Sequence, residues 1–389
     1  MSDVENPTSG SKSRRRVRTR RSRLRRLALP LLALGLVAVA GLLYAWLLGS
    51  GAEGKPAARA LATEPAAVAE RTLAMRPLSL PHDDAPHAGA TEWWYYTGHL
   101  TGADGSRHAF HATVFLRDGM VRHTVFHGSL SDETRNRRRM LQLRTAGIPT
   151  DPKAEGFDFR YGDWRVAGAG PRHSLRMAGE GFVLELAMQD SQAPLLHRAK
   201  GSRTPGLVDF GEAGISYYYS RPRMAARGTL ATDGAAPVVV SGEVWFDHQW
   251  GNFDASRQAW NWFALQLDDG SDLMIYQAFD AAGKPSALLG SLRKGEAVTP
   301  LDAADLKLTT LGVWRSAASG VRYPAGWDVD TPFGRIAVRP VRQDSEFNGL
   351  ETTFKQYWEG GVRVSGARGG QGFLEMSGYD LIPAVQPKE

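Results

Sequence analysis

Apolar and polar residues alternate over short distances along most of the chain from Leu78 onward. The alternating segments are rich in aromatic and β-branched residues, and turns containing Gly, Pro, Asn or Asp separate them, as is typical of β-strands. Only short stretches show helical periodicity. The predicted strands are 92–100, 108–116, 156–165, 173–178, 182–188, 216–220, 224–231, 238–250, 260–267, 273–279, 287–293, 306–314, 326–329, 335–340, 357–365 and 371–381. Many short strands at this spacing predict an all-β fold of two β-barrel-like domains, divided close to Gly251.

The strand predicted at 238–250 carries the highest density of chemical groups. Because side chains alternate between the faces of a strand, His248 shares a face with Val244, Phe246 and Trp250, and Asp247 shares the other with Trp245 and Gln249. The adjacent Asp-His pair is therefore no catalytic dyad unless a bulge turns one side chain. His248 is either a buried, hydrogen-bonded core residue or a proton donor or acceptor lining a cavity. In a dry pocket the pKa of Asp247 would rise, and the residue could act as an acid.

Two aromatic strands indicate either dense packing or the wall of a ligand pocket. Trp93 and Tyr95 share one face of strand 92–100, and Tyr217, Tyr219 and Arg221 share one face of the strand that begins at 216. Exposed aromatic pairs are unfavourable, so both faces need a cover. Buried phenols also need hydrogen-bond partners, which suits a pocket for a mainly apolar ligand with one polar group.

A polar segment precedes the first strand. His82, Asp83, Asp84, His87 and Glu92 match none of the compact zinc spacings, so we expect either a solvated loop or a polar lid at a pocket mouth, and no metal or other cofactor. The chain has no Gly-x-Ser-x-Gly elbow, P-loop, dinucleotide fingerprint or His-Glu-x-x-His. An esterase of the common kind is therefore not expected.

The N-terminal region has the pattern of a membrane anchor. Residues 1–26 hold ten basic and two acidic residues, and residues 27–48 are apolar without a charge. This predicts a basic cytoplasmic tail, a transmembrane signal-anchor helix at 27–48 and a linker at 49–75, with the folded domains in the periplasm. The alternatives are a cleaved signal peptide, with a weak cleavage site at Ala58-Arg59-Ala60, and a loose twin-arginine signal at 19–25.

Charge and cysteine content narrow the choice of partners. The chain has a net charge of +6, and the tail alone carries +8, so residues 27–389 are slightly acidic and nucleic acid is not an expected partner. The absence of cysteine excludes disulfides and thiolate chemistry and is compatible with the periplasm.

Several long motifs resemble the carotenoid 1,2-hydratase/AttH family, a lipocalin-like group often described as predicted secreted hydrolases. They are Glu92-Trp93-Trp94-Tyr95-Tyr96-Thr97-Gly98-His99-Leu100, Ser216-Tyr217-Tyr218-Tyr219-Ser220-Arg221, Phe246-Asp247-His248-Gln249-Trp250-Gly251, Trp262-Phe263-Ala264-Leu265-Gln266-Leu267 and Tyr357-Trp358-Glu359-Gly360. The similarity spans about residues 80–385. It implies an all-β fold of two consecutive lipocalin-like (calycin-type) barrels, at 76–251 and 252–389, after the transmembrane helix.

The resemblance also implies chemistry. Characterised hydratases of this family add water to a terminal isoprenoid double bond, which requires an acid, aromatic faces for the cation and a held water. We therefore predict catalytic roles for His248, Asp247 and Glu92, and a hydrophobic isoprenoid or lipid ligand bound by Trp93, Tyr95, Tyr217, Tyr219, Arg221, Trp250 and Tyr276.

One departure from the family pattern weakens the enzyme hypothesis. The family places an essential Asp two residues after a Tyr on the strand that follows Trp-Phe-Ala, and here Ala278 follows Tyr276 at that spacing. The alternative function is a non-catalytic lipid carrier, or an accessory subunit that contacts the permease of an ABC-type export system. In either case we expect a single-pass protein of the inner membrane.

Overall fold

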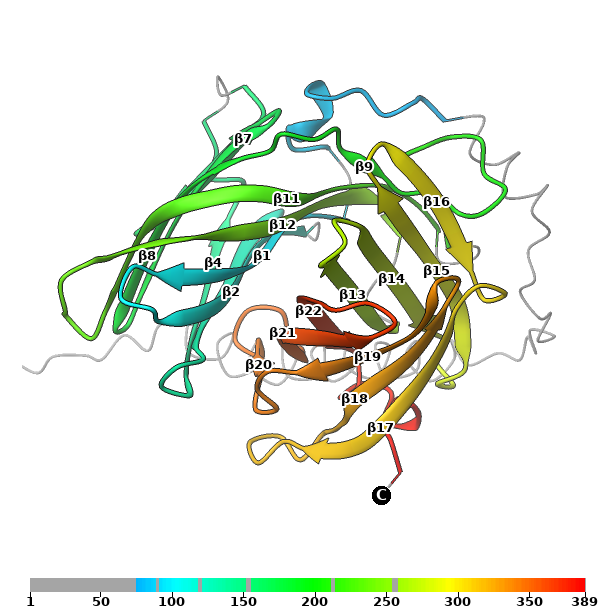
Figure 1. Ribbon diagram of the computed structural model, residues 1–389. Coiled ribbons are helices and arrows are strands. Elements are labelled where there is room, and N and C mark those ends of the chain that lie inside the picture. Colours follow the sequence, from blue (N-terminus) through cyan, green and yellow to red (C-terminus); the bar gives the residue numbers. More distant parts are fainter. Residues whose placement is uncertain are drawn as a thin grey trace, which may run out of the picture. The chain divides into compact units, whose positions relative to one another are not determined.

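The computed structural model describes residues 75–88, 91–117, 121–151, 155–210, 214–253 and 258–388 (Figure 1). All of them belong to one compact unit of the chain. The predicted tail, transmembrane helix and all but the last residue of the linker lie outside these ranges. Within these ranges no helix has the length and apolar character needed to cross a bilayer. The described helices are short 3₁₀ turns, namely η1 (His82–Asp84) and η4 (Pro383–Val385).

The first sheet is antiparallel and runs in the order β4-β3-β2-β1-β12-β11-β8-β7-β6-β5, with β9 and β10 added beside β11. An isolated bridge between Thr150 and Phe159 links the segment after β4 to β5, so the sheet curls into a nearly closed barrel. Its strands are β1 (Thr91–Gly102), β2 (Arg107–Arg117), β3 (His123–Asp132), β4 (Arg137–Ala146), β5 (Phe157–Tyr161), β6 (Trp164–Ala169), β7 (Arg172–Gly179), β8 (Phe182–Gln189), β9 (Leu195–Leu196), β10 (Leu207–Asp209), β11 (Gly214–Thr232) and β12 (Val238–Phe253).

The second sheet is also antiparallel and curled, and its order is β16-β15-β14-β13-β22-β21-β19-β18-β17, with β20 beside β21 (Figure 1, yellow to red). Its strands are β13 (Ala259–Leu267), β14 (Asp272–Phe279), β15 (Pro285–Lys294), β16 (Ala297–Asp302), β17 (Lys307–Arg315), β18 (Arg322–Thr331), β19 (Gly334–Pro340), β20 (Glu346–Asn348), β21 (Gln356–Gly366) and β22 (Gly370–Ser377). The prediction of an all-β fold with two barrel-like, lipocalin-type sheets is confirmed.

Three apolar clusters fill the unit. One lies inside the first barrel and includes Trp94, Tyr96 and Phe246, and a second lies inside the second barrel and includes Phe263 and Trp358. The third joins residues of both sheets, among them Tyr95, Trp245, Tyr218, Trp262 and Phe373. Alternate residues of β1, β12 and β13 thus enter different clusters, because successive side chains of a strand point to opposite faces. The two barrels consequently pack against each other through their outer faces.

Some predicted strand boundaries are wrong for identifiable reasons. The segments predicted at 216–220 and 224–231 form one strand, β11, whose register shifts between Arg221 and Met224, where a proline interrupts the ladder. The single strand predicted at 156–165 is two strands, β5 and β6, with Gly162 at φ 58° in the turn between them. Strand β4 was missed because its residues are polar and none is fully buried, so no alternation marks it.

Candidate functional site

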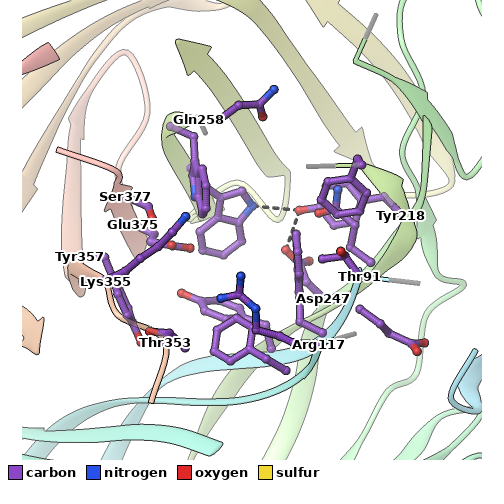
Figure 2. A pocket seen from close by; sticks show the side chains of 18 of the residues that line it. Thr91, Arg117, Tyr218, Asp247, Gln258, Thr353, Lys355, Tyr357, Glu375 and Ser377 are labelled. Atoms are coloured by element: carbon purple, nitrogen blue, oxygen red, sulfur yellow. Dashed lines mark hydrogen bonds between the residues drawn. The ribbon is translucent and has the colours of Figure 1, made fainter. Parts of the chain in front are cut away.

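A pocket of about 150 Å³ lies between the outer faces of the two sheets. Figure 2 shows Glu375, Lys355 and Tyr357 of the second sheet opposite Asp247 and Tyr218 of the first. Aromatic side chains of both sheets form much of the wall, among them Trp93, Tyr95, Phe115, Tyr218, Trp260, Trp262, Tyr276 and Tyr357. An apolar cavity of this volume accommodates a group about the size of benzene. The wall therefore combines a small apolar volume with a few polar groups, as ligand sites commonly do.

Asp247 is the central polar group of the first-sheet wall. Its Oδ1 accepts hydrogen bonds from Trp245 Nε1 at 2.6 Å and from the Ser220 hydroxyl, and its Oδ2 accepts one from Tyr218 Oη at 2.6 Å. Tyr218 Oη in turn accepts from Trp262 Nε1 at 2.9 Å. Burial raises the pKa of Asp247 to about 7, although these hydrogen bonds act in the opposite direction. Near neutral pH the carboxyl is thus divided between its acid and its carboxylate form.

A chain of hydrogen bonds continues behind Asp247 into the second sheet. Ser220 Oγ lies 2.6 Å from His197 Nε2, and His197 Nδ1 lies 2.9 Å from Ser291 Oγ. Burial lowers the pKa of His197 to about 3, so its imidazole is neutral. In a nucleophilic triad the imidazole lies between the carboxylate and the hydroxyl. Here Ser220 lies between Asp247 and His197, so the arrangement positions Asp247 and does not activate a serine nucleophile.

Two glutamates lie side by side in the second sheet. Glu359 of β21 and Glu375 of β22 are direct partners in register; Glu359 is buried and Glu375 is partly buried. The Tyr95 hydroxyl of the first sheet donates a hydrogen bond to Glu359 Oε1. Burial raises the pKa of Glu375 to about 7, and burial together with the negative charge of Glu375 raises the pKa of Glu359 well above its ordinary value. Glu375 lines the pocket.

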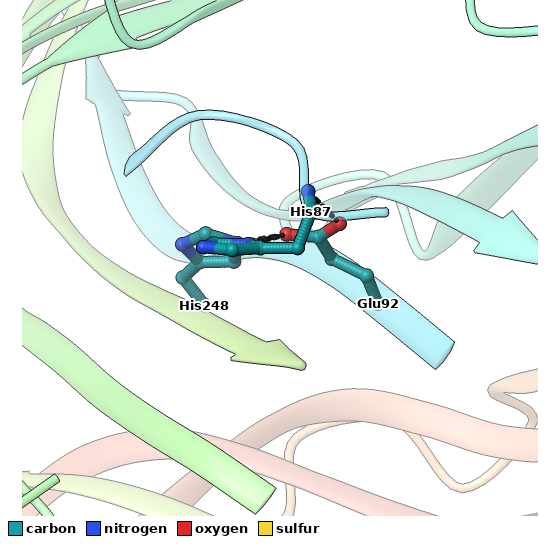
Figure 3. Close-up of side chains that lie close together, drawn as sticks. All are labelled: His87, Glu92 and His248. Atoms are coloured by element: carbon teal, nitrogen blue, oxygen red, sulfur yellow. Dashed lines mark hydrogen bonds and ion pairs between the residues drawn. The ribbon is translucent and has the colours of Figure 1, made fainter. Parts of the chain in front are cut away.

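His87, Glu92 and His248 form a second polar cluster (Figure 3). Glu92 Oε1 accepts hydrogen bonds from His248 Nε2 at 2.9 Å and from His87 Nδ1 at 2.7 Å, and Glu92 Oε2 accepts from the His87 amide at 2.8 Å. Burial alone would raise the pKa of Glu92, but the two histidines outweigh it and hold the pKa below its ordinary value. Burial lowers the pKa of His248. The donor types also suit a divalent cation. Here the three side chains bind one another, and His248 Nδ1 has no hydrogen-bond partner among the described residues.

The structure separates the predicted site residues into two groups. Asp247, Trp93, Tyr95 and Tyr276 line the pocket, and Glu92 contacts its wall although its carboxylate binds the two histidines.

The other predicted residues, His248, Tyr217, Tyr219, Arg221 and Trp250, are not part of the lining of this pocket. Their shared strand face points toward the first barrel, which packed side chains fill. Tyr219 there donates a hydrogen bond to Asp84, and Arg221 Nη1 lies 3.2 Å from Asp190 Oδ2. The Tyr217 ring stacks on the Trp250 ring, with 5.0 Å between the ring centroids. Strand alternation thus puts these five residues on the opposite face from Asp247, away from this pocket, and their predicted catalytic and ligand-binding roles stay predictions.

Several residues of the pocket were not predicted from the sequence. The sequence analysis did not predict Tyr218, because it predicted that Tyr217 and Tyr219 on either side bind the ligand. Side-chain alternation puts Tyr218 on the opposite face of β11 from these two residues, and that is the face that meets Asp247. Glu375, Lys355 and Tyr357 come from β21, β22 and the turn before β21, more than a hundred residues from Asp247. The motif Tyr357-Trp358-Glu359 was recognised in the sequence as part of the family resemblance, but it does not indicate that this strand lies opposite Asp247.

Ala278 occupies the position where the family resemblance places an acid. It pairs with Trp260 across β13 and β14 and lies on the same face of β14 as Tyr276, which lines the pocket. A carboxyl at residue 278 would thus lie on the pocket side of the second sheet. Buried Asp247 and partly buried Glu375 are acids that this chain itself brings to the pocket, besides Glu92, which binds the two histidines.

Known proteins with similar structures share this two-sheet fold. A crystal structure of an AttH protein from Nitrosomonas europaea has a TM-score of 0.71 at 25% sequence identity, covering 78% of this chain and 97% of that one. Kievitone hydratase from Nectria haematococca has a TM-score of 0.65 at 18% identity, covering 79% of this chain and 94% of that one. The second likeness concerns the fold alone.

A sequence relationship is also found. Kievitone hydratase from Fusarium solani subsp. phaseoli is 23% identical over 188 residues, which are 46% of this chain. The chain spans about half the length of that relative, 51%. The family model described as AttH-like matches residues 71–379, most of the chain, and this confirms the family predicted from the sequence motifs. The chain belongs to the AttH-like family.

Proposed function

We propose that the protein adds water to a carbon–carbon double bond of a hydrophobic, isoprenoid-type ligand held in the pocket between the two sheets. The observation that carries this proposal is Asp247, a buried carboxyl with a pKa near 7 that faces an aromatic wall. A general acid works best when its pKa lies near the working pH. The hydratases among the similar proteins support the reaction type.

The reaction would begin with proton transfer. Asp247 donates its proton to the less substituted alkene carbon, and the positive charge develops on the more substituted carbon. A water oxygen then bonds to that carbon and releases one proton, which leaves a tertiary alcohol. General acid catalysis of this kind contributes about 10²–10⁴-fold to a rate.

The aromatic wall would stabilise the cation. A cation over an aromatic face gains about 0.5–2 kcal/mol per ring, so several rings are needed for a large effect. Trp93, Trp260, Trp262 and Tyr276 lie around the same volume as Asp247. That volume suits the branched end of a prenyl chain, with the remainder of a longer ligand extending out of the pocket.

The test uses the full-length protein with two alkenes, the soluble 3-methylbut-2-en-1-ol and lycopene in detergent. In ¹⁸O-labelled water we expect a tertiary alcohol that carries the label, detected by mass spectrometry. Asp247→Asn should slow its formation by about 10²–10⁴-fold. The proposal fails if the wild type forms no alcohol above the protein-free control, or if Asp247→Asn forms it at the wild-type rate.

A second candidate function is a lipid carrier without catalysis, or an accessory subunit of an ABC-type export system. Ala278 favours it, because the acid expected from the family resemblance is absent there. Solvent extraction of purified protein followed by mass spectrometry should then yield one class of unaltered lipid. The same lipid should be recovered from Asp247→Asn. An empty wild-type pocket, or a hydrated ligand, would contradict the carrier function.

We also propose that residues 27–48 anchor the protein in the inner membrane with the folded part in the periplasm, on the basis of the charge-free apolar run behind a basic tail. Cell fractionation with an alkaline wash, combined with protease added to spheroplasts, checks this. The protein should stay in the membrane after the wash and be degraded from outside. Recovery in the soluble fraction would contradict the anchor.

A further inference from the structure

We propose that Glu359 and Glu375 share one proton and that Glu375, as the ionised member, is the general base that activates water opposite Asp247. This inference rests on the proposed hydration reaction for its chemical role. The paired protonation itself depends only on the structure.

The sheet register brings the two carboxyls together. Glu359 and Glu375 are direct cross-strand partners of β21 and β22, so their side chains leave the sheet on the same face. Cβ atoms of such partners lie about 4.5–5.5 Å apart. Glu359 is 1% exposed, and its Oε2 has no hydrogen-bond partner among the described residues. Glu375 is only partly buried, but two like charges on neighbouring side chains of this sheet face are unfavourable, so one of the carboxyls keeps its proton.

The surroundings decide which of the two is ionised. Glu375 receives a hydrogen bond from Trp260 and lies near the ammonium group of Lys355, and both favour its carboxylate form. Glu359 has the Tyr95 hydroxyl and the guanidinium of Arg138. Burial and the negative charge of Glu375 nevertheless raise the pKa of Glu359 well above its ordinary value. Glu359 is thus the protonated member and a positioning residue, and Glu375 is the carboxylate that lines the pocket.

The groups that face the pair come from both sheets. They are Tyr95 of β1, Arg138 of β4, Asp247 of β12, Trp260 of β13, and Lys355 and Tyr357 at the start of β21. Asp247 interacts electrostatically with Glu375, so the two acids titrate against each other. Ionised Glu375 favours the protonated form of Asp247, which is the form that the proposed reaction needs.

The assignment gives each proton a donor and an acceptor. The Asp247 O–H bond breaks as a C–H bond forms at the less substituted alkene carbon. The water oxygen bonds to the cationic carbon, and the proton that it loses passes to the Glu375 carboxylate. One proton then returns from Glu375 to Asp247, through water, to restore the starting state. No oxidant, reductant or further reactant is required.

The first experiment tests the shared proton without any substrate. The carboxyl groups of ¹³C-glutamate-labelled full-length protein are followed by NMR over pH 5–10 in the wild type and in Glu375→Gln. In the wild type, one of the two carboxyls should stay protonated well above pH 7. In Glu375→Gln the pKa of Glu359 should fall, because the opposing charge is gone. An unchanged pKa of Glu359 would overturn the pairing.

A second variant keeps the titration decisive if Glu375→Gln does not fold. Glu359→Gln imitates the neutral acid, so the titration above pH 7 should disappear while the titration of Glu375 near 7 remains. If the high-pH titration persists in this variant, the proton is not shared by this pair. Glu185→Gln serves as the control, since Glu185 is exposed on β8 and binds Arg176 there.

The second experiment tests the role of Glu375 with 3-methylbut-2-en-1-ol in D₂O. If Asp247 forms the cation and Glu375 activates water, Glu375→Gln should form the diol at least about 100-fold more slowly. It should still exchange deuterium into the recovered alkene, because the cation can return its proton. Asp247→Asn should show neither process.

The two proposals fail in different ways. A wild type that neither hydrates nor exchanges the alkene contradicts the proposed function, while the NMR titration still decides whether the proton is shared. A Glu375→Gln variant that hydrates at the wild-type rate overturns the base assignment and leaves the function of Asp247 standing.

Discussion

Two buried carboxyl systems lie on the two faces of the sheet at strands β1 and β12, and their pKa values shift in opposite directions. On the face toward the first barrel, Glu92 accepts hydrogen bonds from His248 and His87, and its pKa is held below the ordinary value. On the face toward the second sheet, Asp247 accepts from Ser220, Tyr218 and Trp245, and its pKa rises to about 7. Both carboxyls are almost completely buried.

Because burial is alike on the two faces, the partners account for the difference. An imidazole can take up a proton and carry a positive charge, so two histidines favour the carboxylate of Glu92. Hydroxyl and indole groups donate hydrogen bonds without a charge, and this compensates the desolvation of Asp247 only in part. A carboxyl that is surrounded by neutral donors is thus the one able to give up a proton near neutral pH. This comparison, rather than closeness in sequence, distinguishes Asp247 from His248.

The largest effect is expected from Asp247→Asn. The amide has the shape of the acid but no transferable proton, so alkene hydration should fall by about 10²–10⁴-fold. The rate of alcohol formation by full-length protein measures this. His248→Gln is the matched variant on the opposite face, and it should retain the reaction if the pocket between the sheets is the site. An equal loss in both variants would contradict the distinction between the faces.

The same Asp247→Asn variant should be more stable than the wild type at alkaline pH. Asp247 keeps its proton up to about pH 7 in the folded state, but an unfolded aspartate loses it near pH 4. Stability contributed by the raised pKa is therefore complete below about pH 4 and is lost as the pH rises toward 7. Above pH 7 the asparagine variant should gain up to about 4 kcal/mol in the free energy of unfolding, and below pH 4 nothing, as measured by urea denaturation.

The sequence predicted the fold class and the alternation on β12 because both depend on local patterns. The aromatic and β-branched segments determine the strands, and the period of two separates Asp247 from His248. It did not predict that the second sheet closes the pocket, since Glu375 and Lys355 reach Asp247 only through the packing of the two barrels. The pattern shows which residues share a face, and packing decides what that face meets.

The next largest effect concerns stability on the opposite face. Glu92→Leu removes the acceptor of the buried His248 and the half-buried His87 and leaves the ring N–H groups that bind it without this partner. Breaking such a buried cluster costs about 3 kcal/mol or more. We expect a corresponding fall in the free energy of unfolding by urea, opposite in sign to the effect of Asp247→Asn at pH 8. A change of less than about 0.5 kcal/mol, as is usual at exposed sites, would mean that the cluster contributes little.

The smallest effect, and the sharpest comparison of the two faces, concerns two neighbouring tyrosines. Tyr218 donates a hydrogen bond to Asp247, and Tyr219 donates one to Asp84 on the opposite face. Tyr218→Phe removes a donor that favours the Asp247 carboxylate, so the pKa of Asp247 should rise. Hydration depends on protonated Asp247 and is lost as the pH rises past its pKa. The alkaline limb of the pH–rate profile should therefore shift to higher pH. The shift should be less than about one pH unit, because one neutral hydrogen bond contributes about 1 kcal/mol.

Tyr219→Phe is the matched control and should leave that limb where it is in the wild type, because its hydroxyl contacts a different carboxyl. A profile measured from pH 5 to 10 for the three proteins separates the outcomes. If Tyr218 passes the proton from Asp247 to the alkene itself, Tyr218→Phe should lose most of the activity at every pH instead of shifting the limb. If neither variant changes the profile, the proton donor is not Asp247, and the difference between the two faces of β12 concerns stability alone.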